Sequence, residues 1–167
     1  MNTVNFTQFL CKSTSENGED IQGIFDTLMC ERGKNTFTIC VYFSQICEVQ
    51  EAFSKYYYRI ILRYLGKSRS ESKHFRVDSG LIFDHADGTD DGEFCEHLVH
   101  HRTTRPGKSG RISILYGFDV ELQGNYEVDL YVKKMENDDT YDSCEKLFVK
   151  DLELVSIAPF QVIFQTN

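Results

Sequence analysis

The stretch Arg111–Lys134, RISILYGFDVELQGNYEVDLYVKK, decides the fold class, because its apolar and polar side chains alternate on both sides of a short turn. The residues of its first half that share one face are Ile112, Ile114, Tyr116, Phe118, Val120 and Leu122, with Leu115 as the exception on the other face. After Gln123-Gly124-Asn125 the alternation resumes with Tyr126, Val128, Leu130 and Val132. A period of two on both sides of a glycine-containing loop predicts an antiparallel hairpin with one buried face.

The same alternation recurs along the rest of the chain. It predicts strands at Thr3–Lys12, Asp20–Cys30, Thr36–Cys47, Lys55–Leu65 and His74–Asp84, and, on either side of a break at Ala158-Pro159, near Glu145–Val155 and Phe160–Gln165. At Asp20–Cys30 a short helix is the alternative, and the flanking turns favour the strand. In the third of these, Phe37, Ile39, Val41 and Phe43 face inward. About eight or nine short strands without a long amphipathic helix predict an all-β fold, an antiparallel sandwich of two sheets.

Length and composition are those of one globular domain. The chain has 167 residues, of which 41% are hydrophobic, so it is long and apolar enough to bury a core. We expect a single domain over residues 1–167, with an irregular segment at 84–110. The net charge of −8 argues against general nucleic-acid binding and against binding to anionic membranes, because both depend on neutralising phosphates. No apolar run is long enough to span a bilayer, and the first residues lack the pattern of a secretion signal.

The six cysteines bear on whether the protein is cytoplasmic or exported. Without a secretion signal, a cytoplasmic protein of bacterial or phage origin is expected, with its thiols reduced and acting as small hydrophobic groups. Their even number permits full pairing in an exported protein, but the spacing does not choose the pairs. The six cysteines are Cys11, Cys30, Cys40, Cys47, Cys95 and Cys144.

Three segments carry a resemblance to a family. They are ENGEDIQGIFDTL (Glu16–Leu28), GNYEVDLYV (Gly124–Val132) and LVSIAPFQV (Leu154–Val162). Together they resemble small bacterial proteins of uncharacterised function that are expected to be β-sandwiches. The resemblance implies a fold and no functional residue.

The segment Cys95-Glu96-His97-Leu98-Val99-His100-His101 holds the densest group of metal-ligating residue types. On a strand, Cys95 and His97 share one face, and His101 joins them after a bend to hold zinc. On a helical turn, His97 and His101 pair instead. The ordered spacing of strong zinc sites is absent, so a solvated loop with surface histidines stays the alternative. A Cys–His nucleophile is disfavoured, because catalytic pairs are normally assembled from distant segments.

Charges around this segment are separated by sign. The acids come first, at Asp84, Asp87, Asp90, Asp91, Glu93 and Glu96, and the bases follow at Arg102, Arg105, Lys108 and Arg111. Opposite charges on two flanks favour a docking loop for a protein partner or a second copy of the chain. The binding residues expected there are Arg102, Arg105, Lys108, Arg111, Asp90 and Asp91. Two solvated flanks that attract each other remain the plainer interpretation.

Two further patterns indicate ligand binding weakly. Residues 102–110 combine bases with small residues, a composition that suits a phosphate, but GKSGR lacks the full P-loop pattern. The run Tyr56-Tyr57-Tyr58 offers aromatic faces on which sugars or bases stack, although tyrosines in a strand more often serve packing.

Three classes of function therefore stay open. We expect first a non-catalytic interaction module that recognises a protein partner or itself, as a homo-oligomer, through residues 84–111. The alternatives are a sandwich that binds a sugar or nucleotide, and a small zinc-dependent enzyme that uses Cys95, His97 and His101. The first is favoured because no complete catalytic set appears, and because sandwiches commonly serve as binding scaffolds. No cofactor other than zinc is implied.

Overall fold

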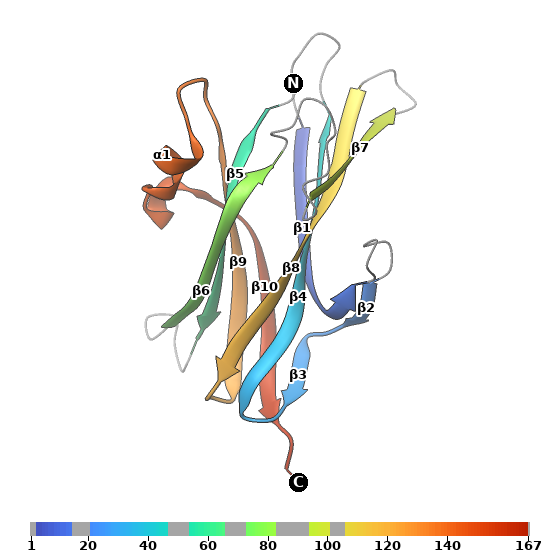
Figure 1. The fold of residues 1–167 in the computed structure, drawn as a ribbon, viewed down its shortest axis with the longest axis vertical. Coiled ribbons are helices and arrows are strands. Elements are labelled where there is room, and N and C mark those ends of the chain that lie inside the picture. Colours follow the sequence, from blue (N-terminus) through green and yellow to red (C-terminus); the bar gives the residue numbers. More distant parts are fainter. Residues whose placement is uncertain are drawn as a thin grey trace.

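The computed structural model describes residues 3–14, 21–46, 54–65, 73–82, 94–100 and 106–166. Two five-stranded sheets pack face to face, which confirms the predicted all-β sandwich (Figure 1). Sheet A has the order β2-β1-β4-β8-β7, and sheet B has the order β3-β10-β9-β5-β6. The strands are β1 (Thr3–Thr14), β2 (Ile21–Ile24), β3 (Thr27–Cys30), β4 (Gly33–Ile46), β5 (Tyr56–Tyr64), β6 (Lys73–Ile82), β7 (Phe94–His100), β8 (Pro106–Val120), β9 (Gly124–Lys134) and β10 (Glu153–Phe164).

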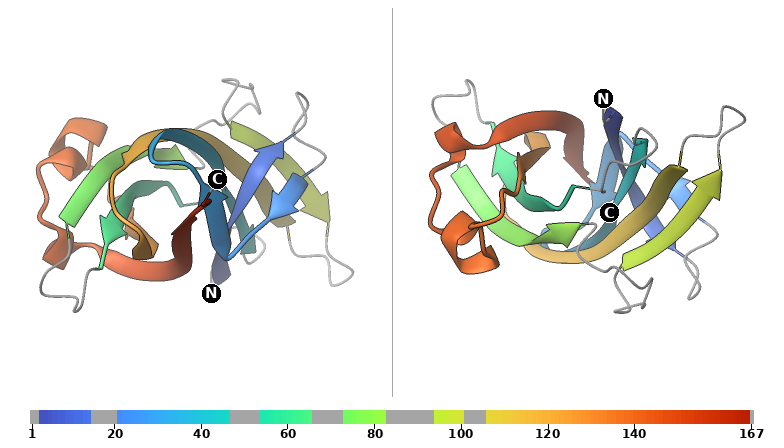
Figure 2. Two further views of the ribbon diagram at one scale, coloured as in Figure 1. Left: turned by 90° about the horizontal axis from the view of Figure 1, so that it is seen from below. Right: turned by 90° about the horizontal axis from the view of Figure 1, so that it is seen from above.

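The core lies between the inner faces of the two curved sheets (Figure 2). Alternation places the expected residues inside: Phe37, Ile39, Val41 and Phe43 of β4, and Tyr126, Val128, Leu130 and Val132 of β9. An aromatic layer joins the sheets, since the ring centroid of Phe160 lies 5.5 Å from that of Phe37 and 5.4 Å from that of Tyr126. Burial of such rings supplies much of the free energy that holds two sheets together.

The predicted hairpin at residues 111–134 is wrong, although both of its strands are present. Val120 and the inward residues predicted for β9 are buried, whereas Leu122, predicted on the same face, is 40% exposed. β8 pairs with β4 and β7 in sheet A, whereas β9 pairs with β5 and β10 in sheet B. The three residues between them therefore carry the chain from one sheet to the other. Gly124, at a φ of 130°, and the bond that the Tyr126 hydroxyl donates to the Leu122 carbonyl (2.8 Å) shape this crossing. Alternation identifies which face is buried but not which strand lies alongside.

The predicted strand Asp20–Cys30 is also corrected, because it is two strands in opposite sheets. β2 pairs with β1, and β3 pairs with β10. The chain changes sheets just after Gly23, whose φ of 66° suits glycine. The two residues between β2 and β3 are each hydrogen-bonded to a different sheet. Phe25 N donates to Leu10 O (3.1 Å) of sheet A, and Gln161 N of sheet B donates to Asp26 O (2.8 Å). The described part has ten strands, and the β3–β10 pair is parallel, so sheet B is mixed.

The third correction concerns the end of the chain. Part of the predicted strand at 145–155 is instead the helix α1 (Tyr141–Glu145) and the 3₁₀ turn η2 (Val149–Asp151). Thr140 starts α1, because its hydroxyl accepts a hydrogen bond from Ser143 N (3.1 Å). β10 then runs through Pro159, where a break was predicted. β3 pairs with β10 only from Gln161 onward, so at Pro159 this side of β10 is not paired with β3. A proline, which has no backbone N–H to donate, is tolerated at such an edge position.

The connection from β9 to β10 forms an arm on the outside of sheet B, over residues 135–152. Figure 2 shows α1 on the side of sheet B that faces away from sheet A. The Ser79 and Tyr141 hydroxyls lie 2.8 Å apart and tie this arm to β6. Within the described residues, no helix has the length and apolar character needed to cross a membrane.

Leu130→Ala is expected to lower the free energy of unfolding by about 2–5 kcal/mol, because it leaves a cavity between the sheets. Leu115→Ala is the matched control, with a side chain 65% exposed on the outer face, and a change within about 0.5 kcal/mol is expected. Chemical denaturation measures both values. Equal losses for the two variants would contradict the assignment of inner and outer faces.

Candidate functional site

β7 runs along an edge of sheet A and contains part of the segment that the sequence singles out. Within the described part of the chain it pairs antiparallel with β8 alone, in a register that sets Cys95 opposite Arg111, His97 opposite Ser109 and Leu98 opposite Lys108. Two of the predicted binding positions, Lys108 and Arg111, therefore lie on the neighbouring strand. The others lie outside the described residues: Asp90, Asp91, Arg102 and Arg105.

The four edge strands of the sandwich differ in how they are protected. β2 and β3 have only four residues each. β6 is longer, but its ladder with β5 is broken by a register shift next to Arg63, and α1 lies against it. β7 has seven residues in an unbroken register and no proline. Natural sheets block unwanted pairing by short edges, bulges and covering elements, and β7 has none of these among the described residues.

The metal site remains a prediction. The side chains of Cys95 and His97, and the whole of His101, lie outside the part that the structure describes. Among the residues that were described, no group of three or more histidine, cysteine or acidic side chains is placed to hold a metal ion.

The run of three tyrosines serves packing. Tyr56 is half-buried, and Tyr57 and Tyr58 are buried, so none presents an open ring face for a sugar or base. Tyr58 points into the core between the sheets. Tyr57 lies on the outer face of sheet B, where the arm covers it.

Arg59 fastens the arm to sheet B, a role that the sequence did not reveal. Its side chain is buried, and its guanidinium donates to three backbone carbonyls of the arm. The distances are 2.9 Å to Leu147 O, 3.2 Å to Cys144 O and 3.1 Å to Glu145 O. Carbonyls at the C-terminal end of a helix attract cations, so Arg59 both satisfies and orients the end of α1.

Tyr57 and Glu145 complete this clamp. The Tyr57 hydroxyl donates to the Glu145 carboxylate (2.5 Å) and accepts a hydrogen bond from Arg59 Nε (3.0 Å). Burial, followed by the bond to Glu145, raises the pKa of Tyr57 to about 12. Burial also pushes the pKa of Glu145 upward, but hydrogen bonds from Ser79 and Tyr57 and the charge of Arg59 outweigh it and lower that pKa overall. A neutral tyrosine beside a charged glutamate is thus the stable arrangement.

A second polar cluster lies further along the same outer face. Arg63 Nε is 2.8 Å from Asp129 Oδ2, and Arg63 also donates to the Tyr131 hydroxyl (3.2 Å). Asp129 is fully buried although it points away from the core, because Ile61 and Ile157 flank it in the neighbouring strands. A carboxylate that is enclosed and paired in this way serves structure, since a substrate does not reach it.

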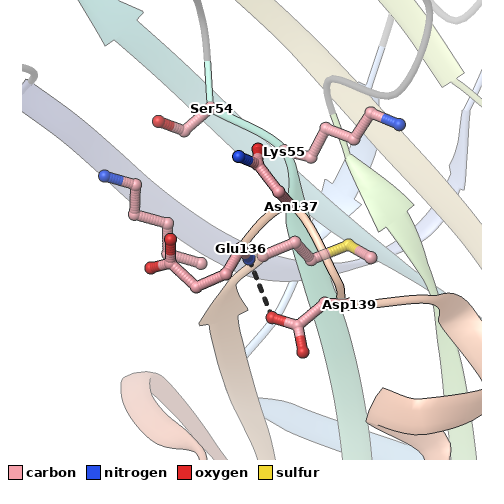
Figure 3. Close-up of a pocket in the computed structure, with 7 residues that line it drawn as sticks. Ser54, Lys55, Glu136, Asn137 and Asp139 are labelled. Atoms are coloured by element: carbon pink, nitrogen blue, oxygen red, sulfur yellow. Dashed lines mark hydrogen bonds between the residues drawn. The ribbon is translucent and has the colours of Figure 1, made fainter.

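A cavity of about 400 Å³ opens at the start of the arm (Figure 3). Asp139 at its wall accepts a hydrogen bond from Glu136 N (2.8 Å) and pairs with Lys133. These two bonds lower the pKa of Asp139. The lining mixes acids and bases, and the two bonds of Asp139 stabilise the turn at which the arm begins. The lining residues are Ser54, Lys55, Lys134, Met135, Glu136, Asn137 and Asp139.

No model of a known protein family matches the chain, and no curated protein matches its sequence. The geometry of the described residues therefore carries the functional argument.

Arg59→Met is expected to release the arm, because three carbonyls lose their donor, and to cost about 2–4 kcal/mol of stability. Hydrogen exchange should speed up at least tenfold at the amides of residues 141–151, measured on the folded protein. Arg32→Met is the matched control, since Arg32 is exposed and lies 4.0 Å from Glu121 at the surface. Unchanged exchange in the arm would show that Arg59 does not hold it.

Tyr57→Phe is expected to remove one of the last tyrosines to ionise. Burial raises the pKa of both Tyr57 and Tyr126 to about 12, so the neutral phenols stabilise the fold fully below pH 10, and this contribution is lost between pH 10 and 12. The ultraviolet absorbance of tyrosinate, followed against pH, measures the change. A wild-type titration complete by pH 11 would refute the assignment.

Proposed function

We propose that this protein is a non-catalytic interaction module that recognises a protein partner or itself through residues 84–111. The observation that carries the proposal is the edge strand β7 at the centre of that segment, which pairs on one side with β8 and on the other side with no strand that the structure describes. We assign to β7 the role of receiving an extended strand from the partner. Its cytoplasmic location is part of the proposal and is supported by the acidic composition.

Strand addition suits the chemistry of an edge. The backbone N–H and C=O groups of an edge strand that are not bonded within the sheet are strong donors and acceptors. A partner strand bonds to them and extends the sheet, with affinity from the main chain and specificity from the side chains. Seven residues offer enough positions for such a ladder.

A second copy of the chain is the occupant that the charges favour. The sequence before β7 is acidic, at Asp90 and Asp91, and the sequence after it is basic, at Arg102 and Arg105. Two antiparallel copies of β7 bring the acidic end of one beside the basic end of the other, twice over in a symmetric dimer. Parallel pairing instead sets like charges together.

Val99→Lys is the test, because a lysine on an edge strand opposes strand addition. Sedimentation velocity should find a wild-type dimer that weakens as salt rises, and Val99→Lys should weaken it at least tenfold. Val77→Lys is the matched control on β6, the edge of the other sheet, where the side chain is half exposed. It should dimerise like the wild type.

Charge exchange sharpens the test. The double change Arg102→Glu and Arg105→Glu should weaken the dimer, and adding Asp90→Arg and Asp91→Arg should restore it. A monomer at every concentration and ionic strength would exclude the second copy as partner. Stoichiometric zinc in the purified protein would favour the alternative in which Cys95, His97 and His101 bind metal.

A further inference from the structure

Two buried thiols lie side by side in sheet A. The Sγ atoms of Cys11 on β1 and Cys40 on β4 are 3.7 Å apart, and both residues are fully buried. The register sets Cys11 opposite Thr38 and Phe9 opposite Cys40, so the two cysteines are diagonal neighbours across one antiparallel pair. Diagonal positions on one face of such a pair bring side chains within reach of each other.

The other cysteines with described side chains have no such neighbour. Cys30 lies in the core between the sheets, where burial raises the pKa of its thiol. Cys144 is buried in α1, on the far side of sheet B. Of the four, only Cys11 and Cys40 have their sulfur atoms in contact. The tertiary structure thus selects one pair that the spacing of the six cysteines does not identify.

We propose that Cys11 and Cys40 form a redox site, at which a low-molecular-weight disulfide such as oxidised glutathione converts the two thiols into a disulfide between β1 and β4. The sulfur atoms must approach from 3.7 Å to about 2.05 Å, and because Cα atoms of diagonal neighbours are about 7–8 Å apart, the side-chain rotation is accompanied by a small shift of the β1 and β4 backbones. The proposal is independent of strand addition at β7.

The chemistry proceeds in two exchanges. The thiolate of one cysteine attacks a sulfur of the small disulfide, forming a mixed disulfide and releasing one small thiol. The thiolate of the second cysteine then attacks the protein sulfur of that mixed disulfide and releases the other small thiol. The two cysteines give up two protons and two electrons, and the small disulfide is reduced to two thiols.

Access to the buried pair comes through β2. This strand has four residues, lies at the edge of sheet A and pairs only with β1, with Ile24 opposite Cys11. Short edge strands open at a lower free energy than the core, so Cys11 becomes reachable without global unfolding. We therefore assign Cys11 as the thiol that reacts first.

The cross-link should stabilise the fold. It joins residues 29 positions apart in sequence and closes a loop that contains β2, β3 and the switch between the sheets. Closing a loop of this length restricts the unfolded chain, and a rise in melting temperature of about 5–10 °C is expected.

The test equilibrates the intact, folded protein in glutathione buffers from reducing to oxidising, then blocks the remaining thiols and maps disulfides by mass spectrometry. The expected result is a Cys11–Cys40 disulfide as the first species to form, together with the higher melting temperature. Cys40→Ala should abolish both changes, and Cys144→Ser, which removes a buried thiol elsewhere, should preserve both. If a variant does not fold, the disulfides mapped in the wild-type protein decide by themselves whether Cys11 and Cys40 pair first.

Three results would overturn the proposal. One is a folded protein that keeps Cys11 and Cys40 reduced in the most oxidising buffer. Another is a first disulfide between other cysteines or between two chains. The last is a Cys11–Cys40 disulfide that forms only in denaturant, because the native contact would then have no part in it.

Discussion

The contact of Phe37 in sheet A with Phe160 in sheet B, 5.5 Å between ring centroids, lies at the centre of the interface on which the molecule depends. Each sheet has one apolar face, and only the other sheet is large enough to cover it. A polar side chain also crosses the interface, since the Gln8 amide of β1 donates to Val128 O of β9 (2.8 Å). The cluster of buried residues described between the sheets is hydrophobic, so packing of rings and aliphatic chains sets the distance between the sheets.

The outer face of sheet B shows a second constraint, which is that buried charge needs partners. Arg59 can be buried because carbonyls of the arm accept hydrogen bonds from its guanidinium. Asp129 can be buried because the charge of Arg63 neutralises its carboxylate. The arm therefore has one stable position, set by the strand that carries Arg59. Arg59 and Arg63 on this face are already bonded within the fold, and we assign recognition to β7.

The alternation of side chains in β4 and β9 was sufficient to predict the strands, their buried faces and the sandwich class. In the structure Arg59 and Arg63 lie on the outer face of sheet B, with Arg59 opposite Tyr131 and Arg63 opposite Glu127 in β9. The cluster that these residues form was missed because its members meet only in the register of β5 with β9. The predicted charges around β7 are in the sequence, but that β7 is an edge strand follows from the order of strands in sheet A.

The sequence by itself determined which side chains avoid water, and hence that the chain forms two layers of strands, because period-two alternation is a local property. The tertiary structure decided what lies beside what: that β8 and β9 belong to different sheets, that β2 and β3 separate at Phe25 and Asp26, and that Cys11 meets Cys40. These choices depend on hydrogen bonds and contacts between residues distant in sequence. A local pattern carries no record of them, since the same alternation satisfies either partner strand.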